Sequence, residues 1–343
     1  TSGEINTLLT FGDVDLLFVG KVEDWEEQKA GVPQGMPIIS FPTYKGCSDI
    51  KEGHQWFDFI NQHEPLQEPH KPKLSDVWTI IFTSGTTGNP KGVVLDYLAN
   101  QSTAALTLDT NALKIDFEGN NTFFSYLPLN HIAERVVVEY AVFRFGGTLS
   151  FAENLDTFAK NLQETQPTVF FAVPRIWTKF QMGILSKIPQ EKLSKLMKIP
   201  VLSWILKRKF NKALGLSKAR SIVSGAAPLQ ETQRTWFRKI GVSITNGYGM
   251  TENCAITTHL GDGIIDKPGS VGLAQPGVEL KIDSETSEIL MRGPFMMKEY
   301  YKQPQLTAEV IKDSWLHTGD QGHIDADGFL FITGRVKDIF KTS

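Results

Sequence analysis

Up to residue 267, short apolar runs alternate with polar connectors and with segments whose apolar positions recur at helical spacing. Residues 77–83 and 168–173 are mostly apolar, as buried strands are, and residues 220–224 are a further predicted strand. Residues 133–145 and 230–239 have the spacing of helices. Strands that alternate with helices in this way predict an α/β body with a mostly parallel sheet.

The pattern changes after residue 267. Residues 278–283, 288–293 and 329–335 are short β-type runs between turns rich in Gly, Pro and Asp. We therefore predict a small β-rich subdomain over residues 268–334 that follows an α/β body over residues 1–267.

Composition adds few constraints, but charge adds one. The chain has 343 residues, of which 41% are hydrophobic and 21% charged, so a disordered or fibrous protein is excluded. Its net charge is −3. Residues 187–220 contain ten Lys or Arg and one acid, Glu191, which leaves −12 for the rest of the chain. A protein that binds nucleic acid over its whole surface is therefore not expected. Cys47 and Cys254 are too few for a disulfide framework, which favours a reducing compartment.

The segment TSGTTGNPKG, residues 83–92, has the chemistry of a phosphate-binding loop. Its three glycines let backbone N–H groups turn toward an anion, and its four hydroxyl side chains add donors. Lys91 supplies a mobile positive charge that suits a phosphate. The spacing differs from a Walker A loop, because Pro90 precedes the lysine and a predicted strand follows it.

Further segments with candidate chemistry follow in order: YLPLNHIAER (126–135), FFAVPRIWTKF (170–180), SGAAPL (224–229), NGYGMTE (246–252), WLHTGDQGHID (315–325) and GRVKDIFKTS (334–343). With the loop, they resemble the adenylate-forming superfamily of acyl-CoA synthetases, luciferases and peptide-synthetase adenylation domains. Residues 126–135 are most similar to long-chain fatty acyl-CoA synthetases. The resemblance implies the N-terminal domain of this superfamily, whose body has two interleaved subdomains with mostly parallel sheets flanked by helices.

The resemblance also implies the nucleotide site. Tyr248 lies between glycines and can stack on a purine, Thr251 can donate to the α-phosphate, and the carboxylate of Glu252 suits Mg²⁺. Asp320 and Arg335 resemble the family's ribose-contacting residues. The implied ATP or AMP contacts are Thr83, Ser84, Gly85, Thr86, Thr87, Gly88, Lys91, Gly225, Ala226, Ala227, Pro228, Asn246, Gly247, Tyr248, Gly249, Thr251, Asp320 and Arg335. The implied catalytic residues are Lys91, His131, Thr251 and Glu252, and the metal ligand is Glu252.

An acyl pocket is implied at His131, Pro174, Trp177 and Gly225. From the residues alone, His131 could equally cap and pack at the start of a helix, and Trp177 could be a core residue. Residues 169–173 are apolar and could contribute to the lining of such a pocket.

The resemblance implies a two-step reaction with ATP, Mg²⁺, coenzyme A and a long-chain fatty acid. The carboxylate would attack the α-phosphorus of ATP and release pyrophosphate, and coenzyme A would then take the acyl group from acyl-AMP. Two alternatives stay open: a fatty acyl-AMP ligase that passes the acyl group to a carrier protein, and a non-catalytic sensor of nucleotide or acyl groups. Intact candidates at the nucleotide site argue against the sensor.

The family's C-terminal lid, which carries a further lysine, has no counterpart in these 343 residues. We therefore expect residues 335–343, with Asp338 at the hinge position, to lead into a missing lid. We also expect the chain alone to bind nucleotide but to turn over poorly. Asp96 stands where many members have His, a departure that leaves the phosphate-binding residues intact.

Residues 187–220 mix ten cations with Ile199, Leu202, Trp204, Ile205 and Leu206. This mixture predicts either peripheral contact with an anionic membrane or a solvated basic helical pair. A cytoplasmic enzyme is expected, with the inner face of a membrane as the site of any contact. No apolar stretch reaches the length of a membrane span. The sequence leaves open whether the chain forms a homo-oligomer.

Overall fold

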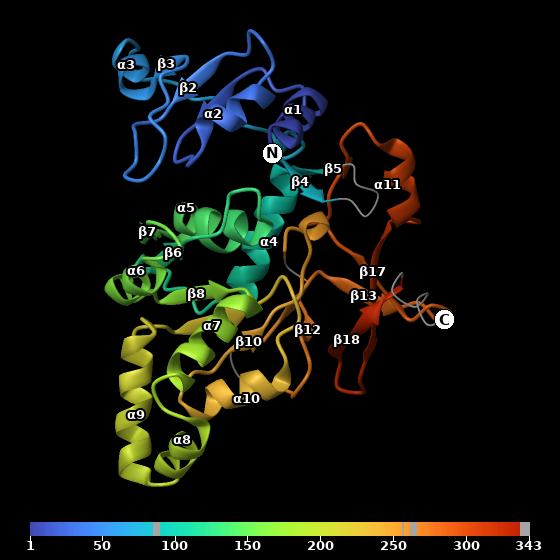
Figure 1. Ribbon diagram of the computed structural model, residues 1–343. Coiled ribbons are helices and arrows are strands. Elements are labelled where there is room, and N and C mark those ends of the chain that lie inside the picture. Colours follow the sequence, from blue (N-terminus) through green and yellow to red (C-terminus); the bar gives the residue numbers. More distant parts are fainter. Residues whose placement is uncertain (85–89, 256, 261–265, 337–343) are drawn as a thin grey trace, which may run out of the picture. The chain divides into compact units, whose positions relative to one another are not determined.

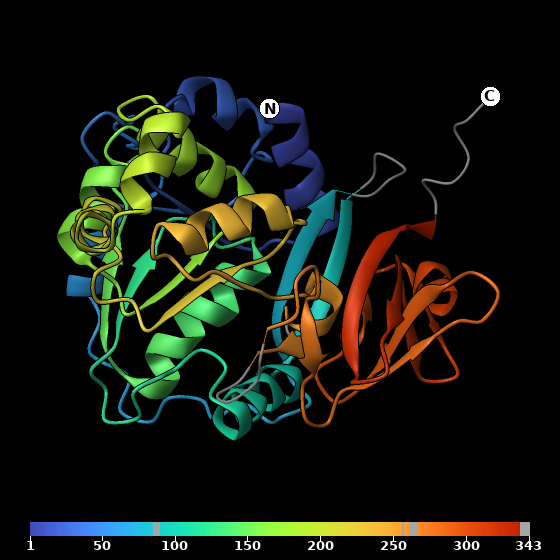
Figure 2. The ribbon, with the colours of Figure 1, turned by 90° about the horizontal axis from the view of Figure 1, so that it is seen from below.

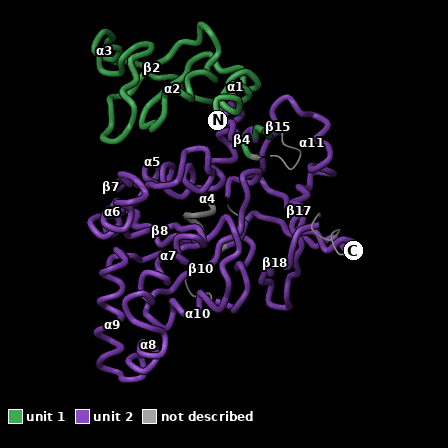
Figure 3. Tube along the Cα trace, viewed as in Figure 1, with its two compact units in different colours: residues 1–73, 82–92 green, residues 74–81, 93–343 purple. Residues whose placement is uncertain are grey.

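The computed structural model describes residues 1–84, 90–255, 257–260 and 266–336 (Figure 1). The chain divides into two compact units (Figure 3). The first unit comprises residues 1–73 and 82–92, and the second comprises residues 74–81 and 93–343. The boundary predicted between residues 267 and 268 is a different division, and it stays a prediction.

The first unit contains a small parallel sheet of order β1-β2-β3. Val19, Trp25 and Ile50 form its buried apolar cluster. The elements of this unit are α1 (Ser2–Phe11), β1 (Leu17–Val19), α2 (Trp25–Gln28), η1 (Lys29–Gly31), β2 (Ile38–Ser40), β3 (His54–Gln55) and α3 (Trp56–Asn61).

The second unit has a parallel sheet of order β10-β9-β8, built from β8 (Val169–Ala172), β9 (Ser221–Ser224) and β10 (Thr245–Asn246). A parallel pair, β6 (Thr122–Ser125) and β7 (Thr148–Phe151), lies beside it, because the Thr168 N–H donates to the Thr122 carbonyl at 2.9 Å. All four residues of β8 are buried, as expected for a sheet that is covered on both faces.

Helices cover the two faces of the parallel sheet. One face packs against α7 (Pro174–Leu185) and α10 (Glu231–Lys239), which contribute Trp177 and Phe237 (Figure 1). The other face packs against a π-helix, η2 (Glu134–Tyr140), which contributes Val137. The helix predicted over residues 133–145 is therefore η2 followed by α5 (Ala141–Phe145).

A second sheet is antiparallel and has the order β11-β12-β18-β17-β14-β13, with β16 paired to β17. Its strands lie in the orange and red part of Figure 2, and all of them except β11 follow residue 267, as the predicted β-rich segment does. Its strands are β11 (Thr258–His259), β12 (Gly272–Ala274), β13 (Glu279–Ile282), β14 (Glu288–Arg292), β16 (Ile311–Lys312), β17 (Trp315–Ile324) and β18 (Phe329–Arg335).

A third sheet has the order β15-β5-β4, with β4 (Val77–Ser84), β5 (Pro90–Asp96) and β15 (Glu299–Tyr300). Helix α4 (Tyr97–Thr110) follows β5 and was not expected from the sequence. The Asp96 carboxylate accepts the Ala99 N–H at 2.8 Å, so Asp96 caps the start of this helix. The departure noted at Asp96 thus has a local structural role.

The basic segment forms a helical hairpin of α8 (Gln190–Met197) and α9 (Pro200–Ala213). Pro189 and Pro200 lie at the starts of these helices, as proline does when it ends one helix and begins another. The remaining elements are α6 (Phe158–Thr165), η3 (Thr251–Asn253) and α11 (Pro304–Val310). No helix in the described part of the chain is both long enough and apolar enough to span a membrane.

Candidate functional site

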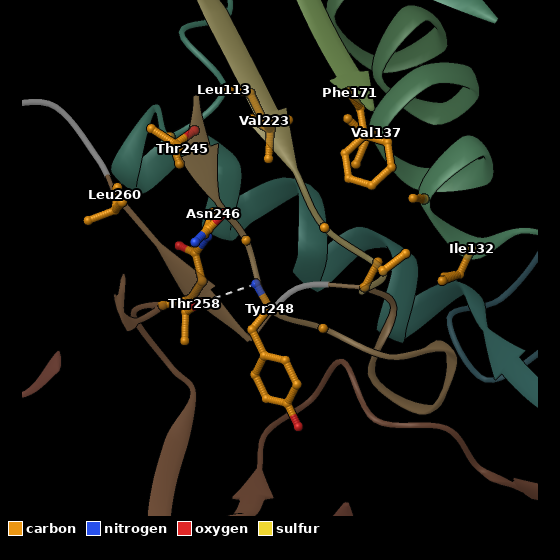
Figure 4. Close-up of a pocket in the computed structure, with 18 of the residues that line it drawn as sticks. Leu113, Ile132, Val137, Phe171, Val223, Thr245, Asn246, Tyr248, Thr258 and Leu260 are labelled. Atoms are coloured by element: carbon orange, nitrogen blue, oxygen red, sulfur yellow. Dashed lines mark hydrogen bonds between the residues drawn. The ribbon is translucent and has the colours of Figure 1, made fainter. Parts of the chain in front are cut away.

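The carboxyl ends of the parallel strands open into a cavity of about 90 Å³ in the second unit (Figure 4). Ligands commonly bind at this edge of a parallel sheet. We call it the central cavity. Its lining residues are Ala112, Leu113, His131, Ile132, Ala133, Val137, Phe171, Val223, Gly225, Ala226, Thr245, Asn246, Gly247, Tyr248, Gly249, Ala255, Thr258, Leu260 and Gln275.

One wall of the central cavity is apolar. Phe171 and Val223 reach it from β8 and β9, and Val137 reaches it from η2 (Figure 4). Leu113, Ile132 and Ala133 extend the same wall. Of residues 169–173, which the sequence suggests as lining, Phe171 lines the cavity. Leu113 and Val137 were not predicted, because they belong to segments that are distant from residues 169–173 in the sequence. Such a wall suits an apolar ligand group.

His131 lies at this wall in a tight turn before η2. Its N–H donates to the Pro128 carbonyl at 2.9 Å, and its Nδ1 accepts the Ala133 N–H at 3.2 Å. Burial lowers the pKa of the imidazole below its ordinary value of 6.5. The ring is therefore neutral at pH 7, and because Nδ1 is an acceptor, its proton is on Nε2. His131 therefore caps the turn and also lines the central cavity, and its role in an acyl pocket stays a prediction.

The buried side chain of Glu134 hydrogen bonds to the segment just before this turn. Its carboxylate accepts the Leu127 N–H at 3.1 Å and also hydrogen bonds with Ser125 and the Tyr126 backbone. Desolvation raises the pKa of this carboxyl. A π-helix starts at Glu134, and such helices are frequent at functional sites. Neither the buried carboxylate nor the π-helix was predicted from the sequence.

The backbone of residues 245–249 forms the opposite side of the central cavity. A Cβ atom at Gly225 would lie 3.2 Å from the Gly247 carbonyl oxygen, so these two chain segments approach closely. At Gly249 a Cβ atom would lie 2.0 Å from the Ala255 carbonyl oxygen, which permits only glycine. The Tyr248 N–H donates to Thr258 Oγ1 at 3.3 Å (Figure 4).

Three predicted nucleotide residues form one hydrogen-bonded chain. The Tyr248 hydroxyl donates to Asp320 Oδ2 at 2.7 Å, and Arg335 Nε donates to Asp320 Oδ1 at 3.0 Å. Asp320 and Arg335 face each other across β17 and β18. Burial and the neighbouring Asp320 carboxylate raise the pKa of Tyr248, so its hydroxyl stays a donor. The Tyr248 ring points away from Phe171 and Val137 in Figure 4.

Glu252, the predicted metal ligand, lies in η3. The Tyr300 hydroxyl donates to Glu252 Oε1 at 2.7 Å, and the Met297 N–H donates to the Glu252 carbonyl oxygen at 2.7 Å. Among the described residues there is no cluster of three or more His, Cys, Asp or Glu that could bind a metal ion. A single carboxylate still fits Mg²⁺, which commonly takes one or two protein carboxylates together with substrate phosphates. Tyr300 was not predicted from the sequence.

The remaining predicted residues divide into three groups. Gly85, Thr86, Thr87, Gly88 and Asp338 lie outside the described residues, as does the Ser84 side chain. Thr83 and Lys91 belong to the first unit, at the end of β4 and the start of β5. Ala227, Pro228, Thr251, Glu252, Asp320 and Arg335 belong to the second unit but are not among the lining of the central cavity.

Trp177 and Pro174 are not part of the cavity lining either. Trp177 is fully buried, and its ring centroid lies 5.4 Å from that of Phe237 and 5.8 Å from that of Phe170. Its Nε1 donates to the Ala172 carbonyl at 3.3 Å. Trp177 is thus a core residue, which is one of the two alternatives that the sequence allows. A role of Trp177 along an acyl channel stays a prediction.

Comparison with known proteins places these features in one family. The family model described as AMP-binding enzyme matches residues 1–301. Long chain acyl-CoA synthetase 2 of Arabidopsis thaliana is 33% identical over 84% of this chain and 48% of its own length. Long chain acyl-CoA synthetase 1 of the same plant is 29% identical over 100% of this chain and 58% of its own length. The chain thus spans about half the length of these relatives.

Solved structures share the fold. The anthranilate CoA ligase AuaEII, solved in complex with anthranoyl-AMP, matches 100% of this chain and 62% of its own with a TM-score of 0.75 and 22% identity. ATP-bound MatB from Rhodopseudomonas palustris matches 98% of this chain and 62% of its own with a TM-score of 0.73 and 23% identity. The α/β body with an added β-rich sheet is therefore confirmed.

Proposed function

Because the chain belongs to the AMP-binding enzyme family, we propose that the protein containing it activates a long-chain fatty acid with ATP and transfers the acyl group to coenzyme A. The carboxylate oxygen attacks the α-phosphorus of ATP, and the bond to the leaving pyrophosphate breaks. The thiolate of coenzyme A then attacks the acyl carbon of acyl-AMP, and AMP leaves. The relatives named as long chain acyl-CoA synthetases support this reaction.

The proposal depends mainly on one observation. The apolar wall and the backbone segment that we predict to contact the nucleotide line the same cavity. Phe171 and Val137 belong to the wall, and Gly247 to Gly249 belong to the segment. The acyl chain and the nucleotide must meet at one point for the adenylate to form. Holding two reactants in contact is the main contribution a protein can make to such a displacement.

The side chains around the cavity have distinct tasks in this proposal. The neutral His131 offers an N–H at Nε2 toward the fatty acid carboxylate and adds no positive charge that would reduce its nucleophilicity. The Asp320 carboxylate, restrained by Tyr248 and Arg335, accepts the ribose hydroxyls. Thr251 donates to the α-phosphate.

We also assign charge stabilisation to two residues. Lys91, at the start of β5, would neutralise charge on the departing pyrophosphate together with the loop amides. Glu252, with Oε1 fixed by Tyr300, would hold Mg²⁺, which when bound supplies further positive charge to the phosphates.

The test is pyrophosphate release by the native full-length protein with ATP and Mg²⁺, using acids from acetate to stearate with and without coenzyme A. We expect turnover that coenzyme A stimulates and that is highest with long chains. Adenylate formation without any effect of coenzyme A would instead identify an acyl-AMP ligase. Nucleotide binding without turnover on any acid would favour a sensor.

Replacing Lys91 by Ala tests the phosphate loop in the same assay. Loss of one preorganised charge donor should lower the rate by roughly 10²–10³ fold. Lys218→Ala is the matched control, because Lys218 is an exposed lysine in the turn before β9. A loss of less than about threefold for Lys91→Ala would show that the loop does not stabilise the leaving group.

A further inference from the structure

Helix α9 is buried on one side and exposed on the other. Phe210 packs into the core beside the parallel sheet, together with Leu214 just after the helix. The opposite face presents Val201, Trp204, Ile205, Arg208 and Lys212, all of them exposed. These five residues recur at spacings of three and four, so they share one face of the helix. We call them the exposed stripe of α9.

The exposed stripe changes character along the helix. Its first two turns are apolar: Val201 is 67% exposed, Trp204 56% and Ile205 36%. Ile199 and Leu202 beside them are also exposed. Its last two turns are cationic, and α9 contains no Asp or Glu. Scattered apolar side chains are ordinary on a protein surface, but five within seven residues at one helix end form a patch.

Exposed cations also lie on the helices that neighbour α9. Exposed lysines Lys192, Lys195 and Lys198 lie on α8 or directly after it. At the other end, a shallow groove is lined by Lys209 and Lys212 of α9 and Lys160 of α6, with Glu164 the acid among its lining residues. The Arg208 guanidinium lies 4.1 Å from the centre of the Trp204 ring, which links the apolar and cationic parts of the stripe.

We propose that the exposed stripe of α9 docks on a membrane surface rich in anionic phospholipids. Val201, Trp204 and Ile205 enter the boundary between headgroups and acyl chains, while Arg208 and Lys212 bind lipid phosphates. Amphipathic helices of this kind combine Trp and aliphatic residues with Lys and Arg. The sequence predicts a membrane contact somewhere within residues 187–220. The proposal assigns that contact to the exposed face of α9.

The abundance of lysine favours a lipid surface over a protein partner. The centres of protein interfaces are depleted in Lys, because its flexible ammonium group is costly to desolvate and to order. At a membrane, the same side chain lays its alkyl stem on the apolar layer and keeps its charge among the headgroups. Each Lys or Arg near an anionic surface then adds attraction.

The proposal is tested by sedimentation of the native full-length protein with vesicles, without ATP or fatty acid, so that the result is independent of the proposed reaction. Neutral phosphatidylcholine vesicles are compared with vesicles that contain one third phosphatidylglycerol. We expect clear preference for the anionic vesicles. Arg208→Gln with Lys212→Gln should weaken that binding roughly tenfold or more, and added salt should weaken it in the wild type.

Two further variants separate the apolar contribution from charge and folding. Val201→Ser with Trp204→Ser should lower binding to anionic vesicles by at least about tenfold. Lys302→Gln with Lys312→Gln, two exposed lysines near the antiparallel sheet, should leave binding unchanged. Thermal unfolding checks that all variants are folded. Equal binding by wild type and both stripe variants would overturn the proposal. So would absence of vesicle binding combined with self-association that the Val201→Ser, Trp204→Ser variant abolishes, because a second copy would then cover the stripe.

Discussion

The two faces of the β8-β9-β10 sheet differ in how completely they are filled. Phe170 and Ile222 point to one face, where they pack with Trp177 and Phe237 in a continuous core. Their immediate neighbours Phe171 and Val223 point to the other face. There they line the central cavity. Since successive side chains of a strand alternate between faces, one strand serves both regions.

Both faces of this sheet are apolar, so the difference between them shows which residues leave room for a cavity. On the filled face, large rings meet edge to face, as Trp177 does with Phe170 and Phe237. On the open face, the residues opposite the strands are smaller, as Ala133 and Val137 are beside Phe171. Space for a ligand therefore arises from the size of the residues that oppose the strands and not from the strands themselves.

Truncating a ring on each face tests this difference most strongly. Trp177→Ala should lower the free energy of unfolding by about 3–5 kcal/mol, because the fully buried ring leaves a cavity in a packed core. Phe171→Ala should cost less, below about 3 kcal/mol, because Phe171 already borders a void. Urea unfolding of both variants measures the two values.

The same pair decides the role of Trp177. If Trp177 is only a core residue, the folded Trp177→Ala protein should keep its chain-length preference, whereas Phe171→Ala should change it. A shifted preference in Trp177→Ala would support the predicted acyl channel. Equal losses of stability in both variants would contradict the contrast between the two faces.

How far the sequence predicts this site depends on the kind of contact. Strands such as residues 77–83 and 168–173 could be predicted because apolar runs are local patterns. The segments around Tyr248 and Asp320 could be found by resemblance. The register that sets Asp320 against Arg335, and the bond from Tyr300 to Glu252, could not, because each joins residues whose proximity depends on pairing between strands and loops. Which face of β8 is open could not be predicted either, since Phe170 and Phe171 are the same residue type.

Tyr248→Phe tests the polar side of the cavity and should have a moderate effect. It removes the hydroxyl that donates to Asp320, and a hydrogen bond to a charged group contributes about 1.5–3 kcal/mol. We expect weaker ATP binding with a modest loss of stability. A double-mutant cycle with Asp320→Asn should show that the two changes are not additive.

Tyr300→Phe is the matched control, because it removes an equivalent buried hydroxyl that donates to Glu252. Its expected consequence is a higher Mg²⁺ requirement with ATP affinity at saturating Mg²⁺ little changed. Calorimetric titration of ATP at several Mg²⁺ concentrations distinguishes the two variants. Additive effects of Tyr248→Phe and Asp320→Asn would show that the hydroxyl does not act through Asp320.

The smallest predicted effect concerns pH and the apolar wall. Burial lowers the pKa of His131 below 6.5 in the folded protein, so below that pH the unfolded chain binds the proton more readily than the folded one. The contribution of His131 to stability is therefore complete above pH 6.5 and decreases as the pH falls toward its lowered pKa. The slope from this residue cannot exceed about 1.4 kcal/mol per pH unit.

Unfolding measured between pH 5 and 8 for the wild type and for His131→Gln isolates this contribution, because the other six histidines are common to both proteins. The difference in free energy of unfolding should be constant above pH 6.5 and should shift in favour of His131→Gln below it. A constant difference across the whole range would mean that the imidazole is solvated as it is in water. The apolar wall would then not exclude water from His131. This face of the sheet would differ from the core around Trp177 in being solvated, and not only in being less completely filled.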